Sequence, residues 1–187
     1  PAFAGEAGEI PRLVHRLARD TSGVLVTGRG REAAAALTQA FADREARKTY
    51  FALVASWPEG QEAGVINAPL RKGRVGGEER VFVDSEGHAD AQAAETLFQV
   101  ERRGRSGRVL LSLEPRTGRT HQLRVHLALA GGAILGDGKY GQRLPADWPA
   151  PKRLYLHAAQ LEIAHPEGGM LRLDAPLPSA FDEALDA

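Results

Sequence analysis

Two polar stretches, each containing a glycine, hold most of the side chains that could take part in catalysis or ligand binding. In the first, residues 14–26, a run with His15, Arg16, Arg19 and Asp20 stops at a glycine and gives way to apolar residues. That order is typical of a loop that presents functional side chains at the lip of a buried strand. Because such side chains on surface loops are more often merely solvated, this stretch alone is only a candidate site.

The second stretch, residues 114–127, has the same character, with a glycine turn followed by polar side chains that run into an apolar face. Thr120 is expected to be the N-cap of a helix over residues 121–130. In such a helix His121 and Arg124 are three apart and share a face. The positive end of the helix would favour a phosphate or carboxylate nearby.

Together the two stretches resemble the RluA-type pseudouridine synthases, which isomerise selected uridines in structured RNA. The family signatures His-Arg-Leu-Asp-x-x-Thr-Ser-Gly and Thr-Gly-Arg-Thr-His-Gln-Leu-Arg-Val-His match residues 15–23 and 117–126 over nearly their full length. Weaker family elements match residues 48–54, 136–141, 154–159 and 161–166. The resemblance therefore extends from about Pro11 to Pro178.

One residue departs from the family pattern at the place that matters most. Directly after His15-Arg16-Leu17, where the family carries its catalytic aspartate, this chain has Ala18. Alanine cannot act as a nucleophile, a base or an ion-pair partner, and loss of a covalent nucleophile removes most of an enzyme's rate enhancement.

Three explanations of Ala18 stay open. The preferred one is an engineered aspartate-to-alanine change that traps an inactive protein, because everything around Ala18 still matches an active enzyme. The second is a natural pseudoenzyme that binds or chaperones RNA. In the third, Asp20 replaces the missing acid, although an offset of two residues moves a carboxylate by roughly 6 Å.

The resemblance implies a role for several other side chains. Tyr50 is expected to stack on the target uracil, Arg124 to pair with the catalytic carboxylate, and Arg16 to fill the gap that the flipped nucleotide leaves in the RNA. The expected RNA contacts are His15, Arg16, Arg19, Lys48, Arg119 and His121. The reaction needs neither a metal nor an organic cofactor, and the expected partner is structured RNA, ribosomal or transfer.

Three other kinds of chemistry fit the residues less well. Residues 28–33 read Gly-x-Gly-x-x-Ala, as in a dinucleotide-binding turn, but residues 47–49 are Arg-Lys-Thr where a ribose-binding acid is expected. His121 and His126 are five apart, a poor spacing for two metal ligands on one helix. Ser22 lacks the Gly-x-Ser-x-Gly turn of a nucleophilic serine.

The formal net charge is zero, which argues weakly against binding to RNA. Residues 101–124, however, hold seven arginines against two glutamates. The acids of the C-terminal part include Asp174, Asp182, Glu183 and Asp186. A basic face on one side of the molecule and arginines scattered over the whole surface are about equally compatible with this pattern.

The 187 residues are enough for one domain with a substantial core, and we expect a single domain over residues 1–187 with residues 1–9 frayed. No N-terminal RNA-binding domain is expected within it, although a chain that starts at Pro1 could have lost a segment. No apolar run approaches the ~20 residues of a membrane span, and no signal peptide is expected. The absence of cysteine excludes disulfides and thiolate chemistry. We expect a cytoplasmic monomer without a membrane partner.

These side chains must be positioned by strands and helices that the sequence also predicts. Strands are expected over residues 24–27, 48–55, 91–100, 109–113, 154–159 and 161–166. Helices are expected over residues 32–41 and 121–130. The resemblance implies an α/β fold of the α+β type, the pseudouridine-synthase fold, with a mixed, mostly antiparallel sheet and flanking helices.

Overall fold

A seven-stranded sheet organises the chain, seen in a computed structural model that describes residues 10–146, 148 and 150–187. The expected fraying of residues 1–9 lies outside this part. The strand order is β11-β10-β4-β9-β8-β5, with β2 paired to β10. The strands are β2 (Ser22–Gly23), β4 (Arg47–Val54), β5 (Ala63–Asn67), β8 (Glu95–Arg103), β9 (Val109–Pro115), β10 (Leu156–Ala164) and β11 (Met170–Asp174).

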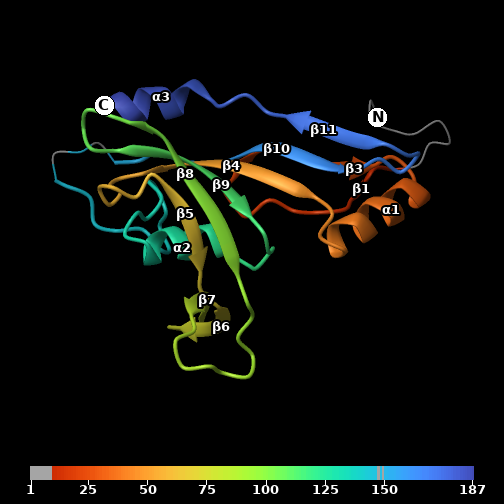
Figure 1. The fold of residues 1–187 in the computed structure, drawn as a ribbon, viewed down its shortest axis with the longest axis horizontal. Helices are drawn as coiled ribbons and strands as arrows, with labels where there is room; N and C mark the ends of the chain where they lie inside the picture. Colours follow the sequence, from red (N-terminus) through yellow and green to blue (C-terminus); the bar gives the residue numbers. More distant parts are fainter. Residues whose placement is uncertain (1–9, 147, 149) are drawn as a thin grey trace.

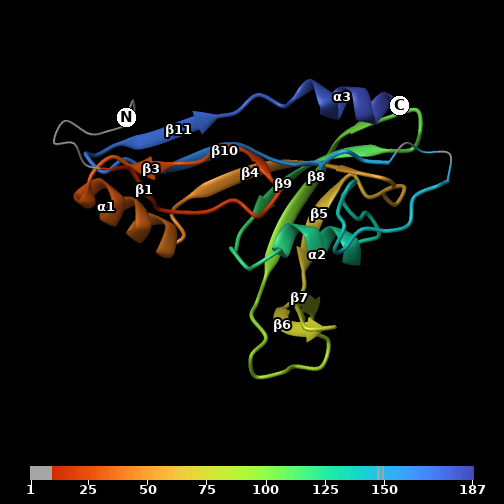
Figure 2. The same cartoon turned by 180° about the vertical axis from the view of Figure 1, so that it is seen from behind.

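The other elements are two small strand pairs and three helices in the described residues. They are β1 (Arg12–Leu13) with β3 (Thr27–Gly28), β6 (Leu70–Val75) with β7 (Glu78–Val83), α1 (Arg31–Ala42), α2 (Gln122–Leu129) and α3 (Ser179–Asp186). Helices α1 and α2 lie on one side of the sheet and α3 on the other, and the β6–β7 hairpin projects beyond α2 (Figures 1 and 2). Every strand pair of the sheet is antiparallel except β2–β10. The expected mixed, mostly antiparallel sheet is confirmed.

The core lies along β4 and β9, which run through the middle of the sheet. Ala52, Leu53 and Val54 of β4 are completely buried, and so are Leu111 and Leu113 of β9. Helices cover both faces here, so these strands are nearly continuous in apolar residues instead of alternating. The two expected strands over residues 48–55 and 109–113 are confirmed with small shifts at their ends.

Several expected element boundaries are wrong. The single strand expected over residues 24–27 is wrong. The chain pairs with β10 at Ser22–Gly23, residues 24–26 belong to no strand, and the chain pairs with β1 only from Thr27. The two expected closing strands are one continuous strand, β10. The cap of α2 is His121, with a φ of 53°, and not Thr120. Neither β11 nor α3 was anticipated.

The β6–β7 hairpin is a two-stranded ribbon with Gly76 and Gly77 at its tip, where φ is 57° and 84°. Positive φ at both central residues is what tight hairpin turns require. The base of the ribbon packs on α2, since Leu70 and Val81 form a buried cluster with Val125. No helix among the described residues has the length and apolar character to cross a lipid bilayer.

Candidate active site

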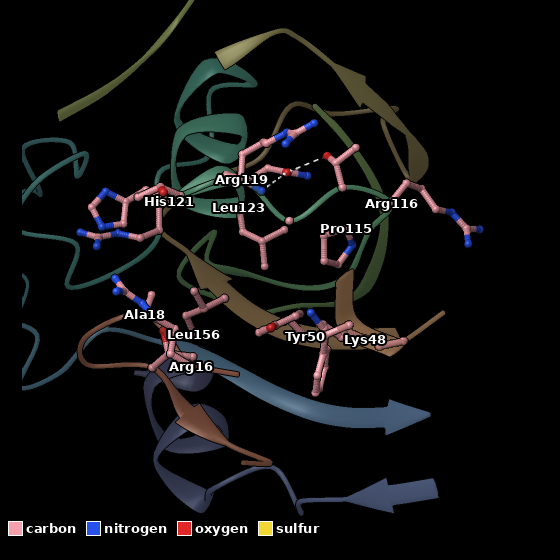
Figure 3. Close-up of a pocket in the computed structure, with 18 of the residues that line it drawn as sticks. Arg16, Ala18, Lys48, Tyr50, Pro115, Arg116, Arg119, His121, Leu123 and Leu156 are labelled. Atoms are coloured by element: carbon pink, nitrogen blue, oxygen red, sulfur yellow. Dashed lines mark hydrogen bonds between the residues drawn. The ribbon is translucent and has the colours of Figure 1, made fainter. Parts of the chain in front are cut away.

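A cavity of about 580 Å³ opens on the sheet face that carries α1 and α2, and both signature stretches line it (Figure 3). Arg16 and Ala18 lie across it from Pro115, Arg119 and Leu123, while β4 contributes side chains beside them. The full lining is Arg16, Ala18, Arg19, Thr21, Phe41, Arg44, Ala46, Lys48, Tyr50, Lys72, Pro115, Arg116, Thr117, Gly118, Arg119, Thr120, His121, Gln122, Leu123, Arg124 and Leu156.

The charge of this lining is entirely of one sign. Eight of its residues are arginine or lysine, and none is aspartate or glutamate. Four of the eight have no carboxylate partner in the described part of the chain, namely Arg16, Arg44, Lys48 and Arg119. A concave surface with this charge attracts polyanions and concentrates them.

The first signature is fixed to β10 by residues 22 and 23. Gly23 has a φ of 115°, and a Cβ there would lie 2.0 Å from the Ala158 carbonyl oxygen, so only glycine fits. The Ser22 hydroxyl donates to Nδ1 of His157 (2.9 Å) and accepts from Arg153 (2.6 Å). His157 is buried and donates from Nε2 to the Ala175 carbonyl (3.1 Å). This chain of hydrogen bonds sets where the preceding loop enters the cavity.

That loop is a β-turn over residues 18–21, closed by a hydrogen bond from the Thr21 amide to the Ala18 carbonyl (3.0 Å). Ala18 lines the cavity, so a longer side chain at this position would extend into it. Thr21 lines the same cavity, and its hydroxyl is buried without a hydrogen-bond partner among the described residues. The turn thus holds the Thr21 hydroxyl, which has no hydrogen-bond partner, three residues after Ala18, where the family carries its aspartate.

Asp20, the expected substitute acid, takes a different position. Its φ is 68°, its side chain is 69% exposed, and it is not part of the cavity lining. Its nearest ion-pair partner is the neighbouring Arg19, at 3.9 Å. The turn therefore presents residue 18 to the cavity and residue 20 to solvent.

Arg124 was expected to lose its countercharge together with the missing aspartate, and the structure corrects this. Asp137 accepts two hydrogen bonds from the Arg124 guanidinium, at 2.7 and 2.5 Å, and two more from the amides of Lys139 and Tyr140. Burial alone would raise the pKa of Asp137, but these hydrogen bonds outweigh it and hold the pKa below the ordinary value. Arg124 is thus held rigidly without a carboxylate at position 18. In the sequence, the only indication of this role of Asp137 was the Gly-Asp-x-x-Tyr-Gly pattern at residues 136–141.

The second signature is held by Gln122, whose amide makes four hydrogen bonds. Its oxygen accepts from the Thr117 hydroxyl (2.7 Å) and the Arg119 amide (3.0 Å), which fixes the loop before α2. Its nitrogen donates to the Glu95 carbonyl (2.8 Å) and the Thr96 hydroxyl (3.0 Å) on β8. Sequence analysis gave Gln122 no role in the site.

His121 faces the cavity in the neutral form. Its Nδ1 accepts from the Tyr140 hydroxyl (2.8 Å), while that hydroxyl accepts from the Val81 amide (3.0 Å). Burial, with a contribution from Arg124, lowers the pKa of His121. In this arrangement the other ring nitrogen carries the proton, and it is available as a donor to a ligand.

Tyr50 and Lys48 bring β4 into the cavity, as the sequence predicted. Tyr50 is partly buried, and this burial raises the pKa of its phenol, so the ring stays neutral. Lys48 lies 4.8 Å from the centre of the Phe41 ring, and burial lowers its pKa. An aromatic ring in a cationic cavity is suited to stack on a nucleobase whose phosphates lie outside.

His15 is the one expected RNA contact that does not line the cavity. Its Nε2 accepts from the Val26 amide (2.9 Å) while its ring contacts Phe41. Burial and the nearby Lys48 lower its pKa to about 4. Of the other expected RNA contacts, Arg16, Arg19, Lys48, Arg119 and His121 all line the cavity.

The arginines of residues 101–124 divide between the cavity and the rest of the surface. Arg116, Arg119 and Arg124 line the cavity, and all three belong to the second polar stretch, residues 114–127. Arg102 pairs with Asp182, Arg103 pairs with Glu62, and Arg108 is buried against the Ala184 carbonyl. The acids Asp182, Glu183 and Asp186 belong to α3, on the far side of the sheet from α1 and α2 (Figure 2). Of the two distributions left open by the sequence, the structure gives an intermediate one, with three of these arginines at the cavity and others paired elsewhere on the surface.

Comparison with known proteins agrees with this geometry. The sequence model of the family described as RNA pseudouridylate synthase matches residues 3–129. Ribosomal large subunit pseudouridine synthase C of Salmonella typhimurium is 40% identical over 181 residues, covering 92% of this chain and 54% of that protein. An uncharacterized RNA pseudouridine synthase of Zymomonas mobilis is 38% identical over 175 residues, which are 92% of this chain and 76% of that protein. The chain spans about half the length of the Salmonella relative.

Solved human structures are similar in fold. Human RNA pseudouridylate synthase domain containing 4 superposes with a TM-score of 0.79 at 30% identity, covering 98% of this chain and 78% of the other. Human RNA pseudouridylate synthase domain containing 1 gives a TM-score of 0.81 at 26% identity, covering 93% and 73%. The whole described sheet and its helices thus correspond to one known architecture.

Proposed function

This chain belongs to the RNA pseudouridylate synthase family, and from that membership we propose that it is the scaffold of an enzyme that converts uridine to pseudouridine in RNA. The observation that carries the proposal is the cavity, in which both family signatures meet around Tyr50 and eight basic side chains. The proposed substrate is structured ribosomal or transfer RNA, and the proposed state is a cytoplasmic monomer. The relatives that carry a ribosomal name support the ribosomal alternative.

The proposed reaction breaks the bond between the ribose and the base, turns the base, and rejoins it through carbon. The target nucleotide must first leave the RNA stack and enter the cavity. Tyr50 would lie against the uracil, Arg16 would occupy the gap in the RNA, and the neutral His121 would donate a hydrogen bond. Apolar groups such as Leu123 and Leu156 would limit the access of water to the detached base.

The missing group is the carboxylate that would attack or stabilise the sugar. We propose that its position is 18, because Ala18 lines the cavity on the same turn as the unpartnered hydroxyl of Thr21. With alanine there, we expect the chain to bind RNA and to leave uridine unchanged.

The test is single-turnover formation of pseudouridine on unmodified large-subunit ribosomal RNA and on transfer RNA. We expect no turnover by the present chain and turnover by Ala18→Asp, with a difference of at least about 10³-fold. Ala18→Asn is the matched control, because it has nearly the same size as aspartate and no charge. Turnover by the present chain would contradict this account of position 18 and would favour Asp20 as the acid.

A second candidate function is a catalytically silent RNA-binding module, and Ala18 is the observation that favours it. If both the present chain and Ala18→Asp bind RNA with a steep salt dependence and neither forms pseudouridine, this second function is correct. An aspartate or glutamate codon at position 18 in the parent gene would show that the alanine was engineered.

A further inference from the structure

Arg44, like Lys48 and Lys72, is a basic residue of the cavity that lies outside both signature stretches. It lies in the connection between α1 and β4 and lines the cavity together with Phe41 and Ala46. The other exposed cations of the rim are Arg16, which belongs to the first signature, and Arg19, Lys72 and Arg116. Those last three have carboxylate partners in Asp20, Glu79 and Glu114. Within the described residues the Arg44 guanidinium has none.

The backbone of Arg44 adopts a conformation that favours glycine. Its φ is 61°, and its amide donates to the Phe41 carbonyl (3.3 Å), while the Glu45 amide donates to the Ala40 carbonyl (3.1 Å). These two hydrogen bonds are the pattern that ends many helices, and the left-handed residue within it is usually glycine because a Cβ is strained there. Arginine at this position therefore lowers the stability of the fold.

Such strain is confined to one region of the molecule. In the described part of the chain the non-glycine residues with positive φ are Asp20, Arg44 and His121. Arg44 and His121 line the cavity, and Asp20 lies between two residues that line it, Arg19 and Thr21. Strained backbone persists where the side chain it orients has a use, and here all three positions surround one site.

We propose that Arg44 binds a backbone phosphate of the RNA next to the flipped uridine, on the α1 side of the cavity. Its guanidinium is exposed, so it can meet a phosphate without entering the space beside Tyr50. The planar fork of arginine matches two phosphate oxygens, and a phosphate provides the partner that the protein does not. This role rests on the proposed function, because it requires RNA at the cavity.

The test is Arg44→Gly, with Arg105→Gly as the matched control. Both variants lose one positive charge, and Arg105 lies in the exposed β8–β9 turn, outside the cavity lining. Filter binding to unmodified large-subunit ribosomal RNA is measured between 50 and 300 mM salt, and thermal unfolding is measured without RNA. We expect Arg44→Gly to bind about five- to tenfold more weakly at 0.1 M salt, with a salt slope smaller by about one. Its unfolding midpoint should stay unchanged or rise by up to about 3 °C, since the strain is removed.

Arg44→Lys separates charge from geometry, and we expect it to keep only part of the affinity, because lysine retains the charge but cannot present a planar fork to two phosphate oxygens. The proposal is overturned if Arg44→Gly binds RNA as tightly as Arg105→Gly does, or if it unfolds several degrees earlier, which would make Arg44 a structural residue. If the unmodified chain itself does not bind the RNA, the proposed function fails, and the role of Arg44 fails with it.

Discussion

At the scale of single residues, Asp137 explains how the cavity keeps its shape although Ala18 offers no charge. Arg124 has only a tenth of its side chain exposed, and Asp137 accepts hydrogen bonds from Nε and Nη2 of its guanidinium. A buried cation without a partner is strongly destabilising, whereas a fully hydrogen-bonded pair is tolerated. The pair therefore holds Arg124 in place in the cavity wall without a carboxylate at position 18.

We predict that Asp137→Asn lowers the free energy of unfolding at pH 7 by about 3–5 kcal/mol, because it leaves the Arg124 charge buried and unpaired. Urea unfolding followed by circular dichroism measures the change. Asp182→Asn is the control, since it breaks an exposed pair with Arg102 and should cost less than about 1 kcal/mol. A loss as small as the control's would mean that Arg124 does not depend on Asp137.

At the scale of elements, the cavity is built where strands and helices end. The first signature ends in β2, and Arg44 follows the end of α1. The second signature lies in the connection between β9 and α2 and in the first turns of α2. Gln122, the first residue of α2, joins that second segment to β8 through its four hydrogen bonds. Its buried amide thus fixes the backbone of the loop before α2, which forms part of the cavity wall.

Replacement of Gln122 by methionine, which has a similar shape and no amide, is expected to cost about 2–4 kcal/mol of stability, because several buried polar groups lose their partners. Hydrogen exchange should become faster at the amides of residues 117–122. Gln39→Met on the exposed face of α1 is the control and should change stability by no more than about 0.5 kcal/mol. Unchanged exchange in residues 117–122 would show that other contacts hold the loop.

Local sequence patterns were sufficient to predict the helices and strands that depend on helix propensity or on continuous burial. The alanine-rich run over 32–41 and the apolar runs of β4 and β9 were identified correctly, since propensity and burial determine them. The strand expected over 24–27 was wrong, because Gly23 pairs with a segment more than 130 residues away. The partner of Arg124 was missed for a similar reason, as the Asp137 loop approaches it only in the folded chain. Matching a family pattern located Ala18, Tyr50 and Arg124, but it gave no indication of Arg44.

At the scale of the whole molecule, three of the six histidines have a lowered pKa, namely His15, His121 and His126. The unfolded chain takes up protons on these side chains near pH 6.5, while the folded chain holds His15 neutral down to about pH 4. Protonation therefore favours the unfolded state in this range. Stability from these residues is fully present above pH 6.5 and is lost as the pH falls from 6.5 towards 4.

We predict that His15→Gln, which keeps an acceptor for the Val26 amide and does not titrate, weakens this pH dependence. Between pH 6.5 and pH 4 the parent should lose roughly 1–2 kcal/mol more stability than the variant, since partial exposure of the ring screens part of the effect. Urea unfolding at half-unit pH steps measures both curves. If the free energies of unfolding of the parent and of His15→Gln change in parallel with pH, His15 is protonated in the folded protein as readily as in the unfolded chain.

The parallel pairing of β2 with β10 has a consequence for how the protein is made. The hydrogen-bond partners of residues 22–23 lie at 157–158 and are synthesised more than 130 residues later. Domains generally fold as the chain emerges, but this contact cannot form until β10 is outside the exit tunnel. The turn with Ala18 is therefore synthesised well before it can take its final position. A nascent chain that has not yet reached β10 has an incomplete cavity.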